Sequence, residues 1–221
     1  MKTDLAIGVL VSGSGSNLQS IIDQIASGRL SARIAVVICN NPTALSVERA
    51  KKHGIPCSVV DHRKFATREE FDREMIGILL DKGVDLVVLA GFMRILSPLF
   101  LRTFPMRIMN IHPALLPAFP GTHGQRQAFE FGVKLSGCTV HFVDDGVDTG
   151  PIIVQAAVPV LEDDTEETLG ARILREEHRI YPQAIQWYAE GRLSVKSRRV
   201  FLRGGQPPCD VPLHHPPLDR F

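Results

Sequence analysis

Several common signals are scarce or absent in this sequence. Its 221 residues carry a formal net charge of only +1, so no overall basic field predicts binding to nucleic acid. No apolar run approaches the roughly 18 residues of a membrane span, and the longest one, Leu86–Met93, is interrupted by Gly91. Strand-like residues follow Met1 almost directly, which leaves no room for a signal peptide. We therefore expect a cytoplasmic protein that binds no membrane.

Cysteine is also sparse, and no pair has the C-x-x-C spacing that is typical of metal or redox sites. The four residues are Cys39, Cys57, Cys138 and Cys209. Three of them lie in or beside strand-like segments. In a reducing compartment this pattern favours small buried thiols over disulfides or metal ligands.

The length and composition indicate a globular protein. A chain of 221 residues fits one generous domain, or one domain with a tail. A chain of this size buries about 70% of its unfolded surface, so it needs no disulfide or metal for stability. Apolar residues make up 44% and charged residues 22%, both ordinary values for a globular chain.

The first half alternates short apolar runs with helical patterns. The helices are expected at Asn17–Ala26, at Ala44–His53 and at Arg68–Lys82, where Thr67 and Glu70 have the spacing of a capping box. The expected strands are Leu5–Val11, Ile34–Cys39, Cys57–Val60, Leu86–Ala90 and Arg107–His112. Continuously apolar strands between helices predict a parallel sheet that is covered on both faces.

The second half has a different pattern. The tight segment 144–150 joins two expected strands, Ser136–Val143 and Ile152–Val160, and leaves no room for a helix. This pair should therefore be antiparallel. A long helix follows, for which Asp164 and Glu167 are a candidate capping pair, and Pro182 is predicted to kink or split it. We expect a single domain over residues 1–196 and a partly disordered tail over 197–221, where five prolines occur from Pro207 onward.

A glycine-rich turn, Ser12–Ser16, follows the first expected strand and precedes a helix. Free N–H groups and the helix dipole at such a turn favour an anion. The turn lacks the Gly-Lys-Ser/Thr of a Walker loop. It also lacks the dinucleotide fingerprint, because Leu18 occupies the third glycine position. The alternatives are a phosphate site and a plain tight turn that caps a helix.

Two residues of one strand, Asn110 and His112, share a face because they are two positions apart. An amide donor beside an imidazole suits the stabilisation of a developing oxyanion. The alternative is a polar pair at a strand end whose hydrogen bonds are satisfied internally.

The acidic segment that follows contains Asp144, Asp145 and Asp148 among glycines. Asp and Gly are ordinary turn residues, so a turn explains the segment as well as a catalytic carboxylate does. The spacing of a calcium-binding loop is absent, and we expect no metal.

Glu177 lies in an otherwise apolar stripe of the last helix, where a carboxylate costs free energy unless it has a partner. Either it pairs internally, for example with Arg172 or Arg175, or it faces a ligand.

Five motifs together resemble one family, the glycinamide ribonucleotide formyltransferases. They occur in the family's order, and the resemblance runs from about Leu5 to Arg192. The similar segments are Gly8–Asn17 (GVLVSGSGSN), Ala90–Pro98 (AGFMRILSP), Asn110–Gly121 (NIHPALLPAFPG), Val140–Gly150 (VHFVDDGVDTG) and Glu177–Pro182 (EHRIYP).

This resemblance implies an α/β, Rossmann-like formyltransferase fold. Its sheet has seven mostly parallel strands with an antiparallel end, and helices on both faces. A nucleotide-binding half at about 1–105 meets a folate-binding half at about 106–196. The matching catalytic residues are Asn110, His112 and Asp148. The matching ribonucleotide-binding residues are Gly13, Ser14, Gly15, Ser16, Asn17 and Glu177, and the matching folate-binding residues are Arg68, Met93, Arg94, Ile95, Leu96, Asn110, Val143, Asp144 and Asp148.

The implied reaction moves a formyl group from 10-formyltetrahydrofolate, the co-substrate, to glycinamide ribonucleotide. No metal is required. Asn110 and a protonated His112 would donate to the oxyanion, and Asp148 would raise the pKa of His112 and manage the proton that the amine loses.

Related activities remain as alternatives. A 10-formyltetrahydrofolate hydrolase uses water as acceptor but carries an extra domain before its catalytic half, which we do not expect here. Methionyl-tRNA formyltransferase needs a further basic domain, for which about 30 residues after Arg192 do not suffice. A non-catalytic nucleotide-binding module would not need the catalytic trio. The chain varies from the family after Gly121, so no role is assigned to His123 or Gln125, and the sequence leaves a homodimer open.

Overall fold

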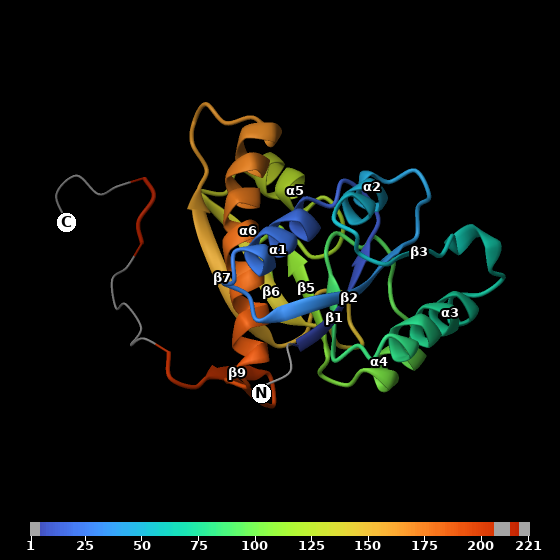
Figure 1. Cartoon of the computed structure of the whole chain (residues 1–221). Coiled ribbons are helices and arrows are strands. Elements are labelled where there is room, and N and C mark those ends of the chain that lie inside the picture. The colour runs from blue at the N-terminus through green and yellow to red at the C-terminus, as the bar shows by residue number, and fades with distance from the viewer. Residues whose placement is uncertain (1–4, 206–212, 217–221) are drawn as a thin grey trace.

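A single sheet runs through the protein, which a computed structural model describes over residues 5–205 and 213–216 (Figure 1). Nine strands within these residues lie in the order β3-β2-β1-β4-β5-β6-β7-β9-β8. The strands are β1 Leu5–Val11, β2 Ala32–Cys39, β3 Cys57–Val59, β4 Leu86–Leu89, β5 Ile108–His112, β6 Leu135–Phe142, β7 Ile152–Pro159, β8 Leu193–Lys196 and β9 Arg199–Leu202. The helices are α1 Ser16–Ala26, α2 Leu45–Lys52, α3 Arg68–Asp81, α4 Pro98–Thr103, α5 Gly124–Phe131 and α6 Glu166–Ala189, with a short 3-10 turn, η1, at His62–Lys64.

The sheet confirms the predicted change from parallel to antiparallel pairing. Strands β3, β2, β1, β4 and β5 run parallel to one another. Strand β6 is antiparallel to both β5 and β7. Because β1, β4 and β5 are parallel neighbours, their carboxyl ends meet at one edge of the sheet, which is where ligands bind in open sheets of this kind.

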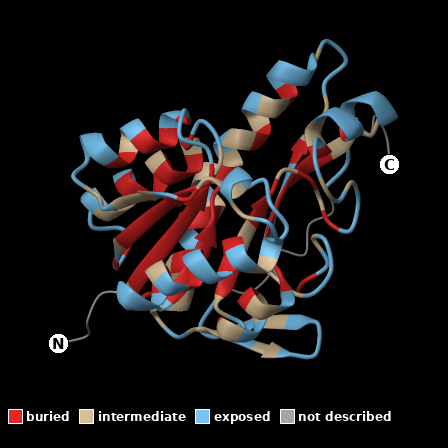
Figure 2. Cartoon of the chain, turned by 90° about the vertical axis from the view of Figure 1, so that its right-hand side faces the viewer, coloured by how far each residue is buried: buried red, intermediate tan, exposed pale blue. Residues whose placement is uncertain are grey.

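Helices cover both faces of the sheet, as predicted. Side chains of β1 alternate between two cores: Ile7 and Val9 pack with α1, α2 and α6, whereas Ala6 and Leu10 pack with α3 and α4. Figure 2 shows the strands as the buried layer between these helices. This arrangement explains why the central strands are almost continuously apolar.

The number of strands differs from the seven that we expected. The two further strands, β8 and β9, form an antiparallel hairpin after α6, and β9 pairs with β7 through Ile152 and Arg199. Each has only four residues and alternates half-buried with exposed positions. Segments of only four residues contain too few repeats for an alternating pattern to stand out, so the sequence pattern did not predict them. The proline-rich segment from Pro207 lies outside the described residues, except for 213–216.

Helix α3 begins as predicted, with a reciprocal capping box between Thr67 and Glu70. Helix α6, in contrast, runs unbroken through Pro182, although we expected a kink or a split. A proline at this position leaves the carbonyl of His178 without its helical N–H donor. Ser20 Oγ on α1 donates to that carbonyl instead, at 2.9 Å. A contact between distant helices therefore lets α6 accommodate the proline.

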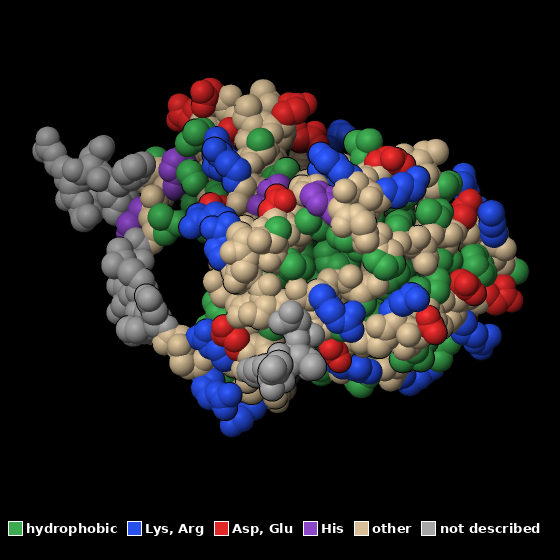
Figure 3. Space-filling view, in the orientation of Figure 1, with side chains coloured by type: hydrophobic (Ala, Val, Ile, Leu, Met, Phe, Trp, Pro, Cys, Tyr) green, Lys and Arg blue, Asp and Glu red, His purple; other side chains and the backbone are tan. Residues whose placement is uncertain are grey.

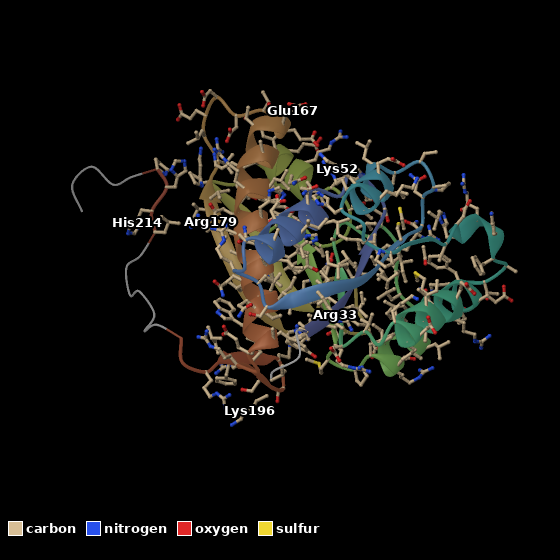
Figure 4. The ribbon with its side chains drawn as sticks, in the orientation of Figure 1. Arg33, Lys52, Glu167, Arg179, Lys196 and His214 are labelled. Atoms are coloured by element: carbon tan, nitrogen blue, oxygen red, sulfur yellow. The ribbon has the colours of Figure 1, made fainter. Side chains whose placement is uncertain are left out.

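The start of α6 is capped by Thr165 and Thr168 rather than by the predicted pair. Asp164 instead accepts from Arg172, whose Nη1 lies 2.6 Å from Oδ2. Glu167 near the start of α6 and Lys196 at the end of β8 lie at opposite ends of the molecule, so α6 spans it (Figure 4). This length places residues from the middle of α6 beside α1.

The three cysteines in the described part of the chain are free thiols. Cys39 and Cys138 are buried and Cys57 is half-buried, in agreement with the prediction. Burial raises the pKa of the Cys138 thiol above its ordinary value. Cys209 lies outside the described residues.

Candidate active site

A cavity of about 270 Å³ opens at the carboxyl ends of β4 and β5. One wall is the loop after β4 and the other is the acidic loop between β6 and β7. The floor comes from the end of β5. The residues that line it include Met93–Leu96, Asn110, His112, Gly121, His141 and Val143–Asp148.

Asp148 joins the two polar residues at the end of β5. Its Oδ1 accepts from Asn110 Nδ2 at 3.3 Å, and its Oδ2 lies 3.3 Å from His112 Nδ1. The Gly121 N–H also donates to Oδ2, at 2.8 Å. The structure thus brings together the three predicted catalytic residues, two from the end of β5 and one from the acidic loop 38 positions after Asn110.

His112 is held between two acceptors. Its Nε2 lies 2.8 Å from the carbonyl oxygen of Phe119, opposite the Asp148 contact on Nδ1. A ring with a proton on both nitrogens would donate to both neighbours. Burial nevertheless lowers the pKa of His112 below its ordinary value; Asp148 and Phe119 raise it, and His141 lowers it further. Asp148 acts in the direction that we expected, but burial outweighs it.

The carboxylate of Asp148 is favoured over its protonated form. Burial raises its pKa, but contacts with His141, the Gly121 N–H and His112 outweigh burial, so that the pKa lies below its ordinary value. Asp148 and His112 therefore both have pKa values below their ordinary ones.

The backbone of the acidic loop is arranged around Asp148. Its φ of 54° lies in the left-handed region, which is uncommon for a residue with a side chain. Asp144 Oδ1 closes the loop by accepting from Gly146 N at 3.2 Å and from Thr149 Oγ1 at 2.6 Å. Backbone strain of this kind persists where surrounding contacts enforce it, and it is common at active sites.

His141 is a buried residue that the sequence analysis did not assign. Its Nδ1 lies 2.8 Å from the carbonyl oxygen of Phe142, so Nδ1 donates there, and in the tautomer with its proton on Nδ1 the other nitrogen, Nε2, is an acceptor. Asn110 Nδ2 lies 3.2 Å from that Nε2, because Asn110 and His141 are paired across β5 and β6. His141 therefore fixes which end of the Asn110 amide is the donor. Only the strand register, which the sequence pattern does not give, would have identified it.

The glycine loop connects β1 to α1. Gly15 is the N-cap of α1, with a φ of 71°, and a Cβ there would lie 2.8 Å from the Cβ of Ser46. Gly13 has open space where its Cβ would be. The loop is fixed from α2 by Arg49 Nε, which donates to Ser14 O at 2.8 Å. Its first helical N–H groups are those that would bind an anion.

Glu177 meets this loop. Its Oε2 accepts from Asn17 Nδ2 at 2.7 Å, and both residues are buried. Burial raises the pKa of Glu177, and the Asn17 hydrogen bond offsets only part of that. Its partner is therefore neither Arg172 nor Arg175, as we considered, but Asn17 in the first turn of α1, directly after the glycine loop. The sequence could not show this contact, which joins helices 160 positions apart.

All of the residues expected to bind folate except Arg68 line the cavity. Met93 and Ile95 are 67% and 62% exposed and offer an apolar surface there. Leu96 also lines the cavity, although it is largely buried in the core. Arg68 lines a smaller adjoining cavity of about 160 Å³, together with Arg94 and Ile95. The glycine loop and Glu177 are not among the lining residues of either cavity.

Other features of the described residues bear on function. Among residues 5–205 and 213–216, no three His, Cys, Asp or Glu side chains are grouped to hold a metal ion. In the same ranges, no helix has the length and apolarity needed to cross a bilayer. On the face shown in Figure 3, basic and acidic side chains are interspersed around hydrophobic ones.

Comparisons with known proteins agree with this geometry. The sequence model of a family described as formyl transferase matches residues 5–185. The phosphoribosylglycinamide formyltransferase of Escherichia coli (strain K12) is 45% identical over 202 residues, which cover 91% of this chain and 95% of that protein. The crystal structure of glycinamide ribonucleotide transformylase 1 from Symbiobacterium toebii superimposes with a TM-score of 0.90 at 54% identity, covering 91% of this chain and 95% of that one.

The chain is also similar to part of a much longer protein. The trifunctional purine biosynthetic protein adenosine-3 of Drosophila melanogaster is 51% identical over 187 residues. These cover 84% of this chain but only 14% of the longer protein.

Proposed function

Since the chain belongs to the formyl transferase family, we propose that it transfers a formyl group from 10-formyltetrahydrofolate to the amino group of glycinamide ribonucleotide. It is a phosphoribosylglycinamide formyltransferase, an enzyme of purine biosynthesis. The observation that carries the assignment is the similarity to the enzymes of that name along nearly the whole chain, with Asn110, His112 and Asp148 gathered on one cavity. A cytoplasmic location is part of the same proposal.

The chemistry assigns a task to each member of the trio. The lone pair of the substrate amine attacks the formyl carbon, and the carbonyl oxygen becomes an oxyanion. Asn110 Nδ2 donates to that oxygen, and so does a protonated His112, one of whose ring nitrogens must exchange its contact with Phe119 or Asp148 for the oxyanion. Asp148 stabilises the imidazolium and takes part in moving the proton from the attacking amine to the folate nitrogen that leaves.

The two walls of the cavity are suited to a folate. The exposed side chains of Met93 and Ile95 offer apolar contact to a flat heterocycle. The backbone of Val143–Asp148 offers hydrogen bonds on the other side. Arg68 and Arg94, at the adjoining cavity, are placed to bind the carboxylates of the folate tail. In this proposal, residues of both the nucleotide-binding half and the folate-binding half form the folate site.

The glycine loop is suited to the phosphate of the ribonucleotide. Free N–H groups at the start of α1 and the backbone of Gly13 favour an anion there. Glu177, held by Asn17 beside the loop, supplies an acceptor to the same substrate. In this proposal Ser14 and Ser16 contribute further donors.

The assignment is tested by offering two acceptors to the purified protein. With 10-formyltetrahydrofolate present, glycinamide ribonucleotide should be formylated, and release of formate to water should be slow. Formylated ribonucleotide and free formate are measured in the same samples. Rapid formate release that the ribonucleotide does not suppress would contradict the proposal and identify a 10-formyltetrahydrofolate hydrolase.

A substitution in the glycine loop tests the phosphate site. Gly13→Val fills open space in the loop with two methyl groups, whereas a side chain at Gly15 would collide with Ser46 and strain the loop. Losing a charge-assisted hydrogen bond to phosphate costs about 1.5–3 kcal/mol, so KM for the ribonucleotide should rise by about 10- to 150-fold. KM for the folate should change little.

The matched control is Gly77→Val on α3, where a side chain also meets open space. Steady-state kinetics of both variants provide the measurement. An unchanged ribonucleotide KM in a folded Gly13→Val protein would show that this loop does not bind the phosphate.

Arg68 tests the tail of the folate site. Arg68→Ala should weaken folate binding by about 0–1 kcal/mol, because an exposed ion pair contributes little. Titration calorimetry with tetrahydrofolate measures the loss, and Arg73→Ala on the same helix is the control. A larger loss for the ribonucleotide than for folate would contradict the assignment.

A further inference from the structure

Ser12 connects the loop after β1 with the loop after β4. Its N–H donates to the carbonyl of Gly91 at 3.2 Å. Its Oγ accepts from the N–H of Met93 at 2.8 Å, across 81 positions in the chain. These two hydrogen bonds extend the pairing of β1 with β4 beyond the last paired residues, Leu10 and Leu89. Ser12 therefore holds both loops with a single residue.

The two loops serve different ligands in the proposed function, on which this inference rests. Ser12 is the first residue of the glycine-rich turn Ser12–Ser16 and immediately precedes Gly13, the first residue expected to bind the ribonucleotide. Met93 is the first exposed apolar residue of the wall against which folate would lie. Ser12 is thus covalently bonded to Gly13 of the ribonucleotide site and hydrogen-bonded to Met93 of the folate site. It is not itself assigned to either site.

The far ends of both loops are fixed. Ser97 N donates to Asp72 Oδ2 at 2.6 Å, and both residues are fully buried. Ser97 also caps α4. On the other side, Arg49 fixes the carbonyl of Ser14. Because the Ser97 end of the loop is already fixed, a ligand that orders residues 92–96 mainly restricts the end near Met93. Ser12 contacts that end through its hydrogen bond to the Met93 N–H.

We propose that Ser12 is a positioning residue that couples the two substrate sites. A ligand on either loop restricts that loop, and through the Ser12 hydroxyl it restricts the other loop as well. The second ligand then binds to a loop that has already lost part of its freedom, and it binds more tightly. Because such coupling is reciprocal, each ligand raises the affinity of the other by the same factor.

The test measures that factor by titration calorimetry. Glycinamide ribonucleotide and tetrahydrofolate are the probes, because without a formyl group they form a ternary complex that cannot react. Each is titrated alone and in the presence of the other. Wild-type protein should show a coupling factor of about fivefold or more. In Ser12→Ala the factor should fall to about twofold or less, while each ligand alone binds within about threefold of wild type.

Two further variants separate coupling from damage to the fold. Ser12→Thr keeps the hydroxyl and should keep the wild-type factor. Ser27→Ala removes a serine hydroxyl that bonds only to Gln24 at the end of α1, and it should also keep that factor. Thermal unfolding midpoints of all variants confirm that they are folded.

The outcomes are distinguishable. Loss of coupling in Ser12→Ala with its retention in Ser12→Thr and Ser27→Ala supports the proposal. An equal factor in wild type and Ser12→Ala overturns it, and so does a wild-type factor near one. If neither probe binds the wild-type protein, the proposed function itself fails, and the coupling fails with it.

Discussion

Asn110→Ala should lower kcat by about 10²–10³, which is the usual cost of removing one oxyanion donor. The reason is that the partner of Asn110 Nδ2, the charged oxygen, exists only in the tetrahedral state, so the loss is in turnover rather than in binding. In the free protein that amide group faces His141 and Asp148, at 3.2 and 3.3 Å, so donating to the oxyanion means exchanging one of these two acceptors for it.

Steady-state kinetics with both substrates measure this effect. KM for each substrate should stay within about threefold of wild type. A loss that appeared mainly in KM would show that Asn110 binds substrate and does not stabilise the transition state.

Asp148→Asn should lower kcat by about 10²–10⁴, the range for removing a proton-transfer partner. The substitution keeps the shape of the side chain and removes the charge that faces both His112 and His141. It also removes the acceptor that favours a proton on His112 Nδ1. Chemistry that needs imidazolium should therefore slow at neutral pH and recover partly as the pH falls.

Asp145→Asn is the contrasting variant. It removes the same charge three residues away on an exposed position of the same loop. Its effect on kcat should be far smaller, because neither histidine ring contacts it among the described residues. An equal loss of kcat in Asp145→Asn and Asp148→Asn would show that the total charge of the loop matters and that the position of Asp148 does not.

The losses in the trio should also be far from additive. Asp148 contacts both Asn110 and His112, and the three act on one chemical event, so the double variant of Asn110→Ala with Asp148→Asn should lose little more than the worse single variant. His112→Ala should resemble Asp148→Asn for the same reason.

The sequence predicted much of the site because short-range rules apply there. Residues two apart on a strand share a face, which places Asn110 and His112 together. The glycine turn between β1 and α1 and the capping box of α3 follow from local chemistry in the same way. The parallel pairing of the central strands follows from their continuous apolar character.

The remaining features depend on contacts between distant elements. The role of His141 required the register of β5 against β6, and the partner of Glu177 required the packing of α6 on α1. Pro182 does not break α6 because Ser20, on another helix, satisfies the freed carbonyl. The direction of the His112 pKa depends on burial, which the cavity geometry decides. Each of these features depends on residues that are far apart in the sequence, so no local pattern predicts it.

The pKa of His112 tests the central claim, that Asp148 supports the protonated imidazole on which the chemistry depends. It can be measured by NMR titration of the ring in wild type and in Asp148→Asn. In wild type the pKa should lie below the ordinary value for histidine, because burial outweighs Asp148. In Asp148→Asn it should fall further, because the raising charge is gone. A pKa that rises or stays fixed in Asp148→Asn would contradict the account, even if the variant is inactive.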